Sequence, residues 1–305
     1  MKTLRLFQIL SFLLVATLCS CSKEDTPIQD EDKFYTVSLN FNGDITTSDS
    51  PLTRGTATDD LYGLLVWQDG DFFGGGLYDN VEDMKVRLSS SKKYKFVVTA
   101  VKNGKNVLYS NGYLQPMQYS LSNKLNSTSN YYSSFKSGYS QMSNGDTSYY
   151  PETDRYYGEV DNYTPTENGV VNMDLKRTAF GLQYKVSGVS DGTVTVTINN
   201  RKESFFTKSD ITADYTSEEK VITFNDVYYA WLYADNYTEK VTVSASWARG
   251  IGITQDLGSK EVVVKRNRMN IIHIKLATDE SGNNLGIDVE SDSNMNDESV
   301  TIPLG

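Results

Sequence analysis

The stretch that decides the fold is residues 34–41, which reads FYTVSLNF. Its apolar side chains alternate with Thr, Ser and Asn. The apolar residues, which would share one face, are Tyr35, Val37, Leu39 and Phe41. Alternation with a period of two is typical of a β-strand that buries one face and leaves the other in water. The stretch therefore predicts a half-buried strand near the start of the folded chain.

Similar patterns continue along the sequence. We expect further strands at residues 61–67, 84–88, 93–101, 106–109, 170–175, 179–186, 193–198, 221–224, 228–233, 240–248, 260–265 and 269–276. The pairs Asp69-Gly70, Asn103-Gly104 and Asp191-Gly192 favour tight hairpin turns, while the triplet at 74–76 would interrupt a connection. One helical turn is expected at residues 208–214. Short strands at this spacing indicate an all-β fold built of sandwiches or barrels.

The chain of 305 residues is long enough for two domains of ordinary size. Residues 112–166 are rich in Ser, Asn, Gly and Tyr, and regular strand patterns return near residue 169. The two halves resemble a coarse duplication of one all-β plan. We therefore expect an N-terminal domain at residues 34–168 and a C-terminal domain at residues 169–305.

The first residues predict export. Lys2 and Arg5 precede an apolar run at residues 6–18, which is too short for a comfortable membrane span. The end of this run, Leu18-Cys19-Ser20-Cys21, resembles a bacterial lipobox, in which the Cys after the cleavage point is acylated. We expect a signal peptide at residues 1–20, a lipid on Cys21 and an acidic tether at residues 21–33. An ordinary signal peptide without lipid is the alternative.

The composition argues against several classes of function. With 39 Asp+Glu against 29 Lys+Arg, the formal charge is −10, so the chain lacks the positive surface that binds nucleic-acid phosphates. The chain has 1 His and 2 Cys, and the Cys lie at positions 19 and 21, on either side of the expected cleavage point, which argues against His-rich or thiolate metal sites. The strand pattern around His273 does not indicate the additional residues that general-base work needs. We expect no catalytic residue, no cofactor and no metal, and we do not expect an enzyme.

Tyrosines gather between residues 109 and 163. Rigid aromatic rings among Ser, Asn and Gly are typical of binding loops, since they give contact area at low entropic cost. The alternative is that these rings only cover a thin sheet. The candidate ligand contacts are Tyr131, Tyr132, Tyr139, Tyr149, Tyr150, Tyr156 and Tyr157.

Several segments together resemble the fimbrillin family, the subunits of lipoprotein-derived pili in Gram-negative anaerobes. The first is the lipobox followed by the strand at 34–41. The second is the loop Leu52-Thr-Arg-Gly-Thr56 leading into residues 61–67. The third is residues 171–186, similar to the strand pair that opens the family's second domain. Residues 269–276 resemble the family's late strand.

The resemblance implies two tandem transthyretin-like β-sandwich domains. It also implies a route of assembly, because polymerising members are lipidated, carried to the outer membrane and cut after an Arg in the loop behind the first strand. Arg54-Gly55 matches that cleavage position. The cut would displace the strand that carries Tyr35, Val37, Leu39 and Phe41, and a strand of the next subunit would fill the groove.

The C-terminus offers a candidate donor strand. Residues 299–305 read SVTIPLG, in which Val300, Ile302 and Leu304 alternate on one face. Pro303 suits an edge position, and the acidic segment 288–298 would let the strand swing. The alternatives are a tail that folds back on its own domain or is disordered, and an Arg54 that is an ordinary loop residue.

These expectations describe a structural or adhesive subunit of a cell-surface pilus, as stalk, tip or anchor. It would lie on the outer membrane through the lipid on Cys21 and pair with copies of itself or other pilus subunits. It would also contact a host or bacterial surface ligand. The alternative is a monomeric surface lipoprotein that binds glycan or protein through its Tyr-rich loops.

Overall fold

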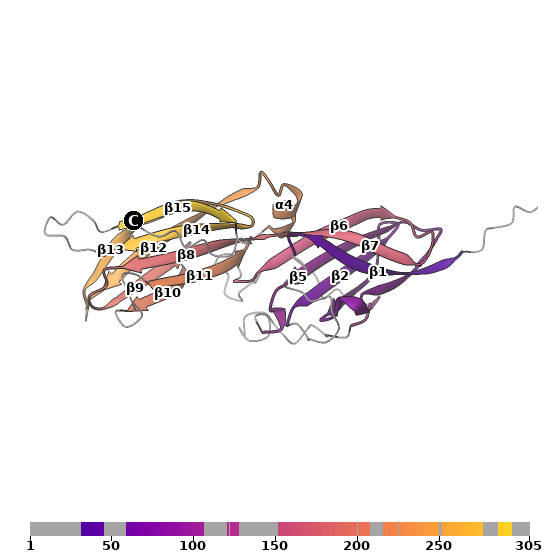
Figure 1. Ribbon diagram of the computed structural model, residues 1–305, viewed down its shortest axis with the longest axis horizontal. Coiled ribbons are helices and arrows are strands. Elements are labelled where there is room, and N and C mark those ends of the chain that lie inside the picture. Colours follow the sequence, from indigo (N-terminus) through magenta and orange to yellow (C-terminus); the bar gives the residue numbers. More distant parts are fainter. Residues whose placement is uncertain are drawn as a thin grey trace, which may run out of the picture.

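The structure, a computed structural model, describes residues 32–45, 59–106, 121, 123–127, 152–199, 201–207, 216–224, 226–249, 252–276 and 286–294. Strands dominate these residues and form two bodies that lie end to end (Figure 1). We name them the N-terminal sandwich, whose strands run from residue 34 to 177, and the C-terminal sandwich, whose strands run from 179 to 294. The all-β prediction is confirmed.

Within the described residues, the N-terminal sandwich contains β1 (Phe34–Gly43), β2 (Leu61–Gln68), β3 (Asp71–Tyr78), β4 (Lys85–Ser89), β5 (Tyr94–Val101), β6 (Arg155–Tyr163) and β7 (Gly169–Arg177), with the 3₁₀ turn η1 (Val81–Asp83) before β4. Their order is β3-β2-β5-β6-β7-β1-β4. The pairing of β6 with β7 is confined to Tyr156↔Arg177 and Tyr157↔Lys176. The sheet therefore folds at this corner into two layers, β3-β2-β5-β6 and β7-β1-β4, around one core.

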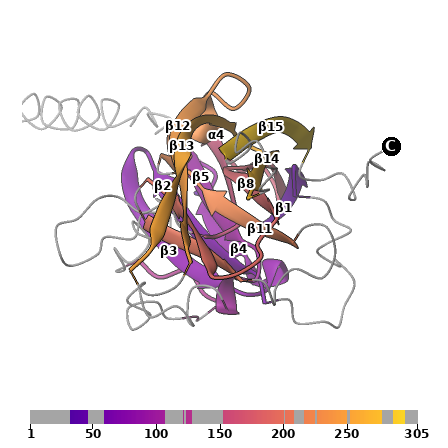
Figure 2. The ribbon, with the colours of Figure 1, turned by 90° about the vertical axis from the view of Figure 1, so that its left-hand side faces the viewer.

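The C-terminal sandwich contains β8 (Ala179–Ser187), β9 (Thr193–Ile198), β10 (Arg201–Thr207), β11 (Thr216–Thr223), β12 (Thr238–Ala248), β13 (Thr254–Lys265), β14 (Arg268–Lys275) and β15 (Gly286–Asn294) among the described residues. They form two sheets, β10-β9-β12-β13 and β11-β8-β14-β15. Seen along the long axis, β12 and β13 lie on one side and β8, β14 and β15 on the other (Figure 2). Trp247 is buried in the core between them, and its indole N–H donates to the carbonyl of Asp191 (2.8 Å).

The boundary between the two cores differs from the predicted one at 168–169. β7 runs parallel to β1 and buries Val171, Met173 and Leu175 in the first core, whereas the second core begins at Phe180. Since β7 ends at Arg177 and β8 begins at Ala179, the change of core falls at residues 177–179. The sequence did not reveal this boundary, because the alternating pattern of β7 indicates that one face is buried but not in which core.

The strand predicted at residues 228–233 is wrong, because this segment forms the helix α4 (Val227–Leu232). Its aromatic residues favour strands in general, and this preference hid the helix. The helix begins behind Asp226, whose carboxylate accepts a hydrogen bond from the backbone N–H of Tyr229 (3.0 Å). An N-cap of this kind was the signal that marked a helix start.

The glycine triplet does not interrupt a connection but lies inside β3. Gly75 exchanges two backbone hydrogen bonds with Asn126, at 3.0 and 2.8 Å. A Cβ on Gly76 would stand 2.6 Å from the carbonyl oxygen of Lys124. The glycines therefore allow residues 123–127 to pass directly against the strand. The hairpin turn at Asp69-Gly70 is confirmed, with positive φ at both residues.

Three other strands had no counterpart in the sequence prediction: β6, β10 and β15. Most of the segment 288–298, which we expected to be a linker, belongs to β15, which pairs with β14 from Gly286 to Asn294. The backbone up to Asn294 is thus held in a sheet. The expected helical turn at 208–214 and most of the expected strand at 106–109 lie outside the described residues.

Candidate functional site

The first strand, β1, occupies an interior place in its layer, between β4 and β7. Its first half pairs antiparallel with β4, from Phe34↔Ser89 to Ser38↔Lys85. Its second half pairs in parallel with β7, from Val37↔Gly169 to Gly43↔Leu175. The indigo strand in Figure 1 runs along β7 in this way. One strand at the start of the chain therefore satisfies the backbone groups of two neighbours.

The inward face of β1 is built from the alternating residues that the sequence singled out. Val37, Leu39 and Phe41 are 0%, 5% and 7% exposed, and Tyr35 is half-buried. The ring of Phe41 stacks on Tyr62 of β2 at a centroid distance of 5.8 Å. The strand thus bridges the two layers of the core, because its side chains reach those of the opposite layer.

The outward face of β1 is polar and is tied to β7 and the loop before it. The amide of Asn40 donates to the side-chain oxygen of Asn172 (2.9 Å). The backbone N–H of Thr36 donates to the side-chain oxygen of Asn168 (2.7 Å). These bonds are partly exposed to water, so each contributes little to stability. Their main effect is to fix the register of β1 against β7, and they add little to the stability of that pairing.

The end of β1 reaches the C-terminal sandwich through Asp44. The Asp44 carboxylate accepts a hydrogen bond from the backbone N–H of Arg177 (2.9 Å) and forms an ion pair with the guanidinium of Arg266. Gly43 precedes it with φ +94, and a Cβ there would stand 2.7 Å from the carbonyl oxygen of Leu175. Only glycine fits this close approach without strain. The segment behind β1 therefore connects the first core to the second.

Two further contacts complete the joint between the sandwiches. Arg177 forms a bidentate ion pair with Asp154, with Nε and Nη2 at 2.7 and 2.6 Å from the carboxylate oxygens. Charge-assisted pairs of this geometry are among the stronger hydrogen bonds in proteins. Beside it, α4 packs on β6, where the ring of Tyr157 meets Trp231 at a centroid distance of 5.5 Å. The joint is therefore both ionic and aromatic.

Tyr156 and Tyr157 do not serve as exposed ligand contacts, contrary to the prediction. They are 4% and 0% exposed within β6, and burial raises the pKa of both hydroxyls above the ordinary value for tyrosine. Tyr157 donates its hydroxyl to Glu159 (2.5 Å) and supports the joint with α4. Because β6 was not predicted, its inward and outward faces could not be assigned from the sequence.

The other sequence-predicted residues lie outside the described part of the chain. They are the lipidation residue Cys21, the cleavage residues Arg54 and Gly55, the donor residues Val300, Ile302 and Leu304, and the tyrosines Tyr131, Tyr132, Tyr139, Tyr149 and Tyr150. Their roles stay predictions.

Sequence reasoning missed Asp44, Arg177 and Arg266. Their partners are distant in the sequence, 133 residues apart for Asp44 and Arg177 and 222 for Asp44 and Arg266. No local pattern announces such contacts. Among the described residues, no group of three or more His, Cys, Asp or Glu side chains could hold a metal ion. Within the same residues, no helix is long and apolar enough to cross a membrane.

Comparison with known proteins gives matches among solved structures. No family model and no curated protein matches the chain. A candidate cell adhesion protein of Bacteroides eggerthii aligns with a TM-score of 0.42 and 10% identity, covering 87% of this chain and 96% of that one. The fimbrial anchor protein Mfa2 of Porphyromonas gingivalis aligns with a TM-score of 0.39 and 10% identity, covering 84% and 95%. The tip fimbrial protein Mfa3 of the same organism aligns with a TM-score of 0.36 and 11% identity, covering 85% and 99%. The chain is thus similar to fimbrial proteins, at low identity.

Proposed function

We propose that this chain is a structural or adhesive subunit of a cell-surface pilus, exported as a lipoprotein and assembled by strand exchange after cleavage behind Arg54. The observation that carries the proposal is the place of β1. It is the first strand of the described residues, it lies between β4 and β7, and its inward side chains form part of the core. A single cut behind it would free it from everything that follows.

Loss of β1 would lower the stability of the N-terminal sandwich, and binding of another strand in its place would restore that stability. Val37, Leu39 and Phe41 are each almost fully buried, and burial of such a side chain stabilises by about 1.5–3 kcal/mol. Together they match a large part of the net stability of a typical domain, about 5–15 kcal/mol. The backbone edges of β4 and β7 would lose their partners as well. An open groove of this kind binds an added strand by backbone hydrogen bonds and side-chain fit.

The C-terminal tail has the chemistry to fill that groove. Val300, Ile302 and Leu304 are spaced at i, i+2 and i+4, the same spacing as Val37, Leu39 and Phe41. β15 ends at Asn294, so residues 295–305 are the segment from which the donor strand would come. A donor from the next copy would therefore place three apolar side chains where β1 places its own.

The test is arginine-specific proteolysis of the purified chain, followed by electrophoresis of unheated samples in SDS. We expect cleavage behind Arg54 to give a ladder of SDS-resistant multimers. The Arg54→Ala variant should stay uncut and monomeric. A second control, a chain that ends at Glu298, should be cut but give no ladder.

A wild-type chain that is cut at Arg54 and stays monomeric would contradict the proposal. It would favour the alternative of a monomeric surface lipoprotein that binds its ligand through the Tyr-rich loops.

A further inference from the structure

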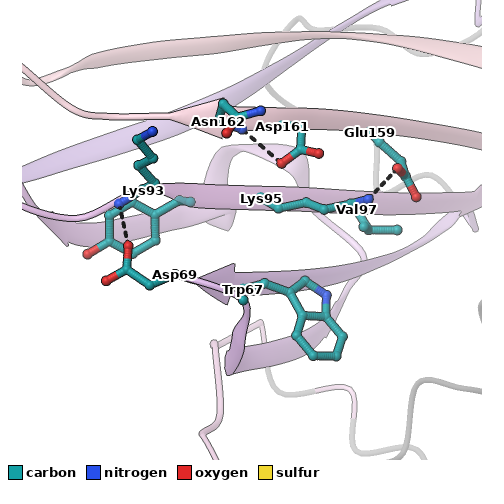
Figure 3. Close-up of a pocket in the computed structure, with 10 residues that line it drawn as sticks. Trp67, Asp69, Lys93, Lys95, Val97, Glu159, Asp161 and Asn162 are labelled. Atoms are coloured by element: carbon teal, nitrogen blue, oxygen red, sulfur yellow. Dashed lines mark hydrogen bonds and ion pairs between the residues drawn. The ribbon is translucent and has the colours of Figure 1, made fainter.

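A hollow of about 600 Å³ lies on the outer face of the layer β2-β5-β6, opposite to the face that packs on β1. Trp67 comes from β2, Lys95 and Val97 from β5, and Glu159 and Asp161 from β6. Figure 3 shows these side chains standing side by side in front of their three strands. The volume lies within the usual range of small-molecule sites, about 300–1,000 Å³.

The strand register explains why these residues gather. Trp67 is the cross-strand partner of Lys95, and Val97 is the partner of Glu159. The residues that alternate with them, such as Val66, Phe96 and Val98, are buried in the core. Trp67, Lys95, Val97 and Glu159 therefore occupy outward positions of their strands, on the face opposite to the main core, and Val97 also packs with Tyr157 beside the joint.

Trp67 supplies a fixed and partly exposed aromatic surface. Its ring packs edge to face against Phe72, with the centroids 5.6 Å apart and the planes at 77°. That contact holds the indole in place and leaves the side chain half-buried at the hollow. A rigid, partly exposed ring gives contact area at little entropic cost. The C–H face of a sugar ring is a natural partner for such a surface.

The charged side chains that line the hollow are Asp69, Lys93, Lys95, Glu159 and Asp161, and three of them take part in close ion pairs. Lys95 binds Glu159 at 2.6 Å, and Asp69 at the rim binds Lys92 at 3.0 Å. In a chain with a formal charge of −10, this face is thus locally close to neutral. A strongly charged ligand would have to break these pairs, whereas a neutral ligand rich in hydroxyls can add hydrogen bonds to them, because a hydroxyl both donates and accepts.

The far rim adds exposed hydrogen-bonding groups. Asp161 and Asn162 are both exposed at the end of β6, and Asp161 accepts a hydrogen bond from the backbone N–H of Asn162 (2.9 Å). The side-chain amide of Asn162 carries both donors and an acceptor. A ligand lying across the three strands would therefore meet an aromatic surface at β2 and polar groups at β5 and β6.

We propose that this hollow binds a neutral glycan, with Trp67 stacking on a sugar ring and the Lys95–Glu159 pair, Asp161 and Asn162 hydrogen-bonding to its hydroxyls. The inference rests on the adhesive part of the proposed function, since an adhesive subunit needs a ligand surface. It is separable from strand exchange, because the hollow and β1 lie on opposite faces of the layer. A chain that forms ladders but binds no glycan would contradict glycan binding in the hollow and leave the proposal of strand exchange intact.

The test is an array of defined neutral oligosaccharides of glucose, mannose, galactose and N-acetylglucosamine, with sialylated and sulfated glycans beside them. The mature full-length chain is the probe, and calorimetry then measures affinity for the best neutral glycan. We expect Trp67→Ala to weaken binding about tenfold or more and Trp67→Phe to retain most of it. The matched control is Tyr229→Ala, an aromatic residue of α4 that is 47% exposed and does not line the hollow. It should bind like the unmodified chain.

Three results would overturn the inference. They are no binding to any neutral glycan, binding to acidic glycans alone, and binding that Trp67→Ala leaves unchanged. Trp67→Phe keeps an aromatic contact with Phe72, so its unfolding temperature should equal that of the unmodified chain. If Trp67→Ala fails to fold, Asn162→Gly at the exposed rim takes its place, because glycine tolerates the positive φ of this residue (56°), and a smaller loss of affinity is expected.

Discussion

The two sandwiches share one arrangement and differ in how the chain enters it. In the N-terminal sandwich, β1 lies between the antiparallel strand β4 and the parallel strand β7. In the C-terminal sandwich, β8 lies between the antiparallel strand β11 and the parallel strand β14. Both interior strands bury alternate side chains; Leu182, Tyr184 and Val186 of β8 are 0% exposed.

The difference is in the covalent connection. β1 precedes all other strands of the described residues, so one cut behind it would separate it covalently from the rest of its sandwich. β8 follows β7 after a single residue and continues toward β9, so release of β8 would need two cuts. The comparison teaches that the order of the strands along the chain, more than the quality of their packing, decides which strand one cut could release.

The largest effect is expected from removal of β1. A chain that begins at Gly55 lacks Val37, Leu39 and Phe41, each worth about 1.5–3 kcal/mol by burial. We expect calorimetry to show an early or missing transition for the N-terminal sandwich and a retained one for the C-terminal sandwich. A peptide of residues 32–45 should restore the first transition. An unchanged first transition without the peptide would show that β1 is dispensable.

Matched core substitutions in the two interior strands sharpen the comparison. Leu39→Ala and Leu182→Ala each remove a side chain that is at most 5% exposed, and each should lower the free energy of unfolding by about 2–5 kcal/mol. Denaturant unfolding before cleavage should show both losses. After cleavage and strand exchange, only Leu182→Ala should still destabilise, because Leu39 has left with β1. A persistent Leu39→Ala effect in the multimer would mean that β1 stays in place.

A smaller effect is expected at the joint between the sandwiches. Asp44→Asn removes the charge that faces Arg266 and weakens the acceptor for the backbone N–H of Arg177. The loss should be about 1–3 kcal/mol, measured as a lower unfolding temperature. The control Asp174→Asn changes an exposed carboxylate of β7 and should have little effect. Equal unfolding temperatures for Asp44→Asn and the unmodified chain would contradict the claim that the charge of Asp44 stabilises the joint.

The smallest effect concerns acid stability at the β2–β3 turn. The backbone N–H of Lys93 and the side chain of Lys92 lower the pKa of Asp69 below its ordinary value of 3.8. A lowered pKa in the folded chain stabilises it at pH values above 3.8, and this contribution is lost as the pH falls through the folded-state pKa. Asp69→Asn should therefore lower the unfolding temperature slightly near pH 6 and not near pH 2. An equal shift at both pH values would contradict this role of the charge.

Strands with strict alternation could be predicted from the sequence. The face of β1 and the alternation around His273 in β14 both follow from the period of two, and Ile272 and Ile274 are buried as that period requires. α4 could not be predicted by the same rule, because Tyr and Trp are common in strands. β3 was hidden by glycines that only a close backbone contact explains.

The candidate sites were predictable to different degrees. β1 and its buried face could be predicted because the residues that form them are contiguous. The hollow at Trp67 could not, since it needs the register of β2, β5 and β6, and β6 was not recognised as a strand. The Asp44 contacts depend on residues far apart in the chain, which no local pattern reports.

One measurement tests strand exchange most directly. Asn172 of β7 lies beside Asn40 of β1, so a donor strand in place of β1 would bring an outward residue next to it. A chain that starts at Ser22 and so lacks the native cysteines can carry Asn172→Cys together with Ser299→Cys or Thr301→Cys. After cleavage at Arg54, we predict disulfide-linked multimers on a non-reducing gel that disappear on reduction. A disulfide confined to the monomer, or formed equally without cleavage, would contradict exchange between copies.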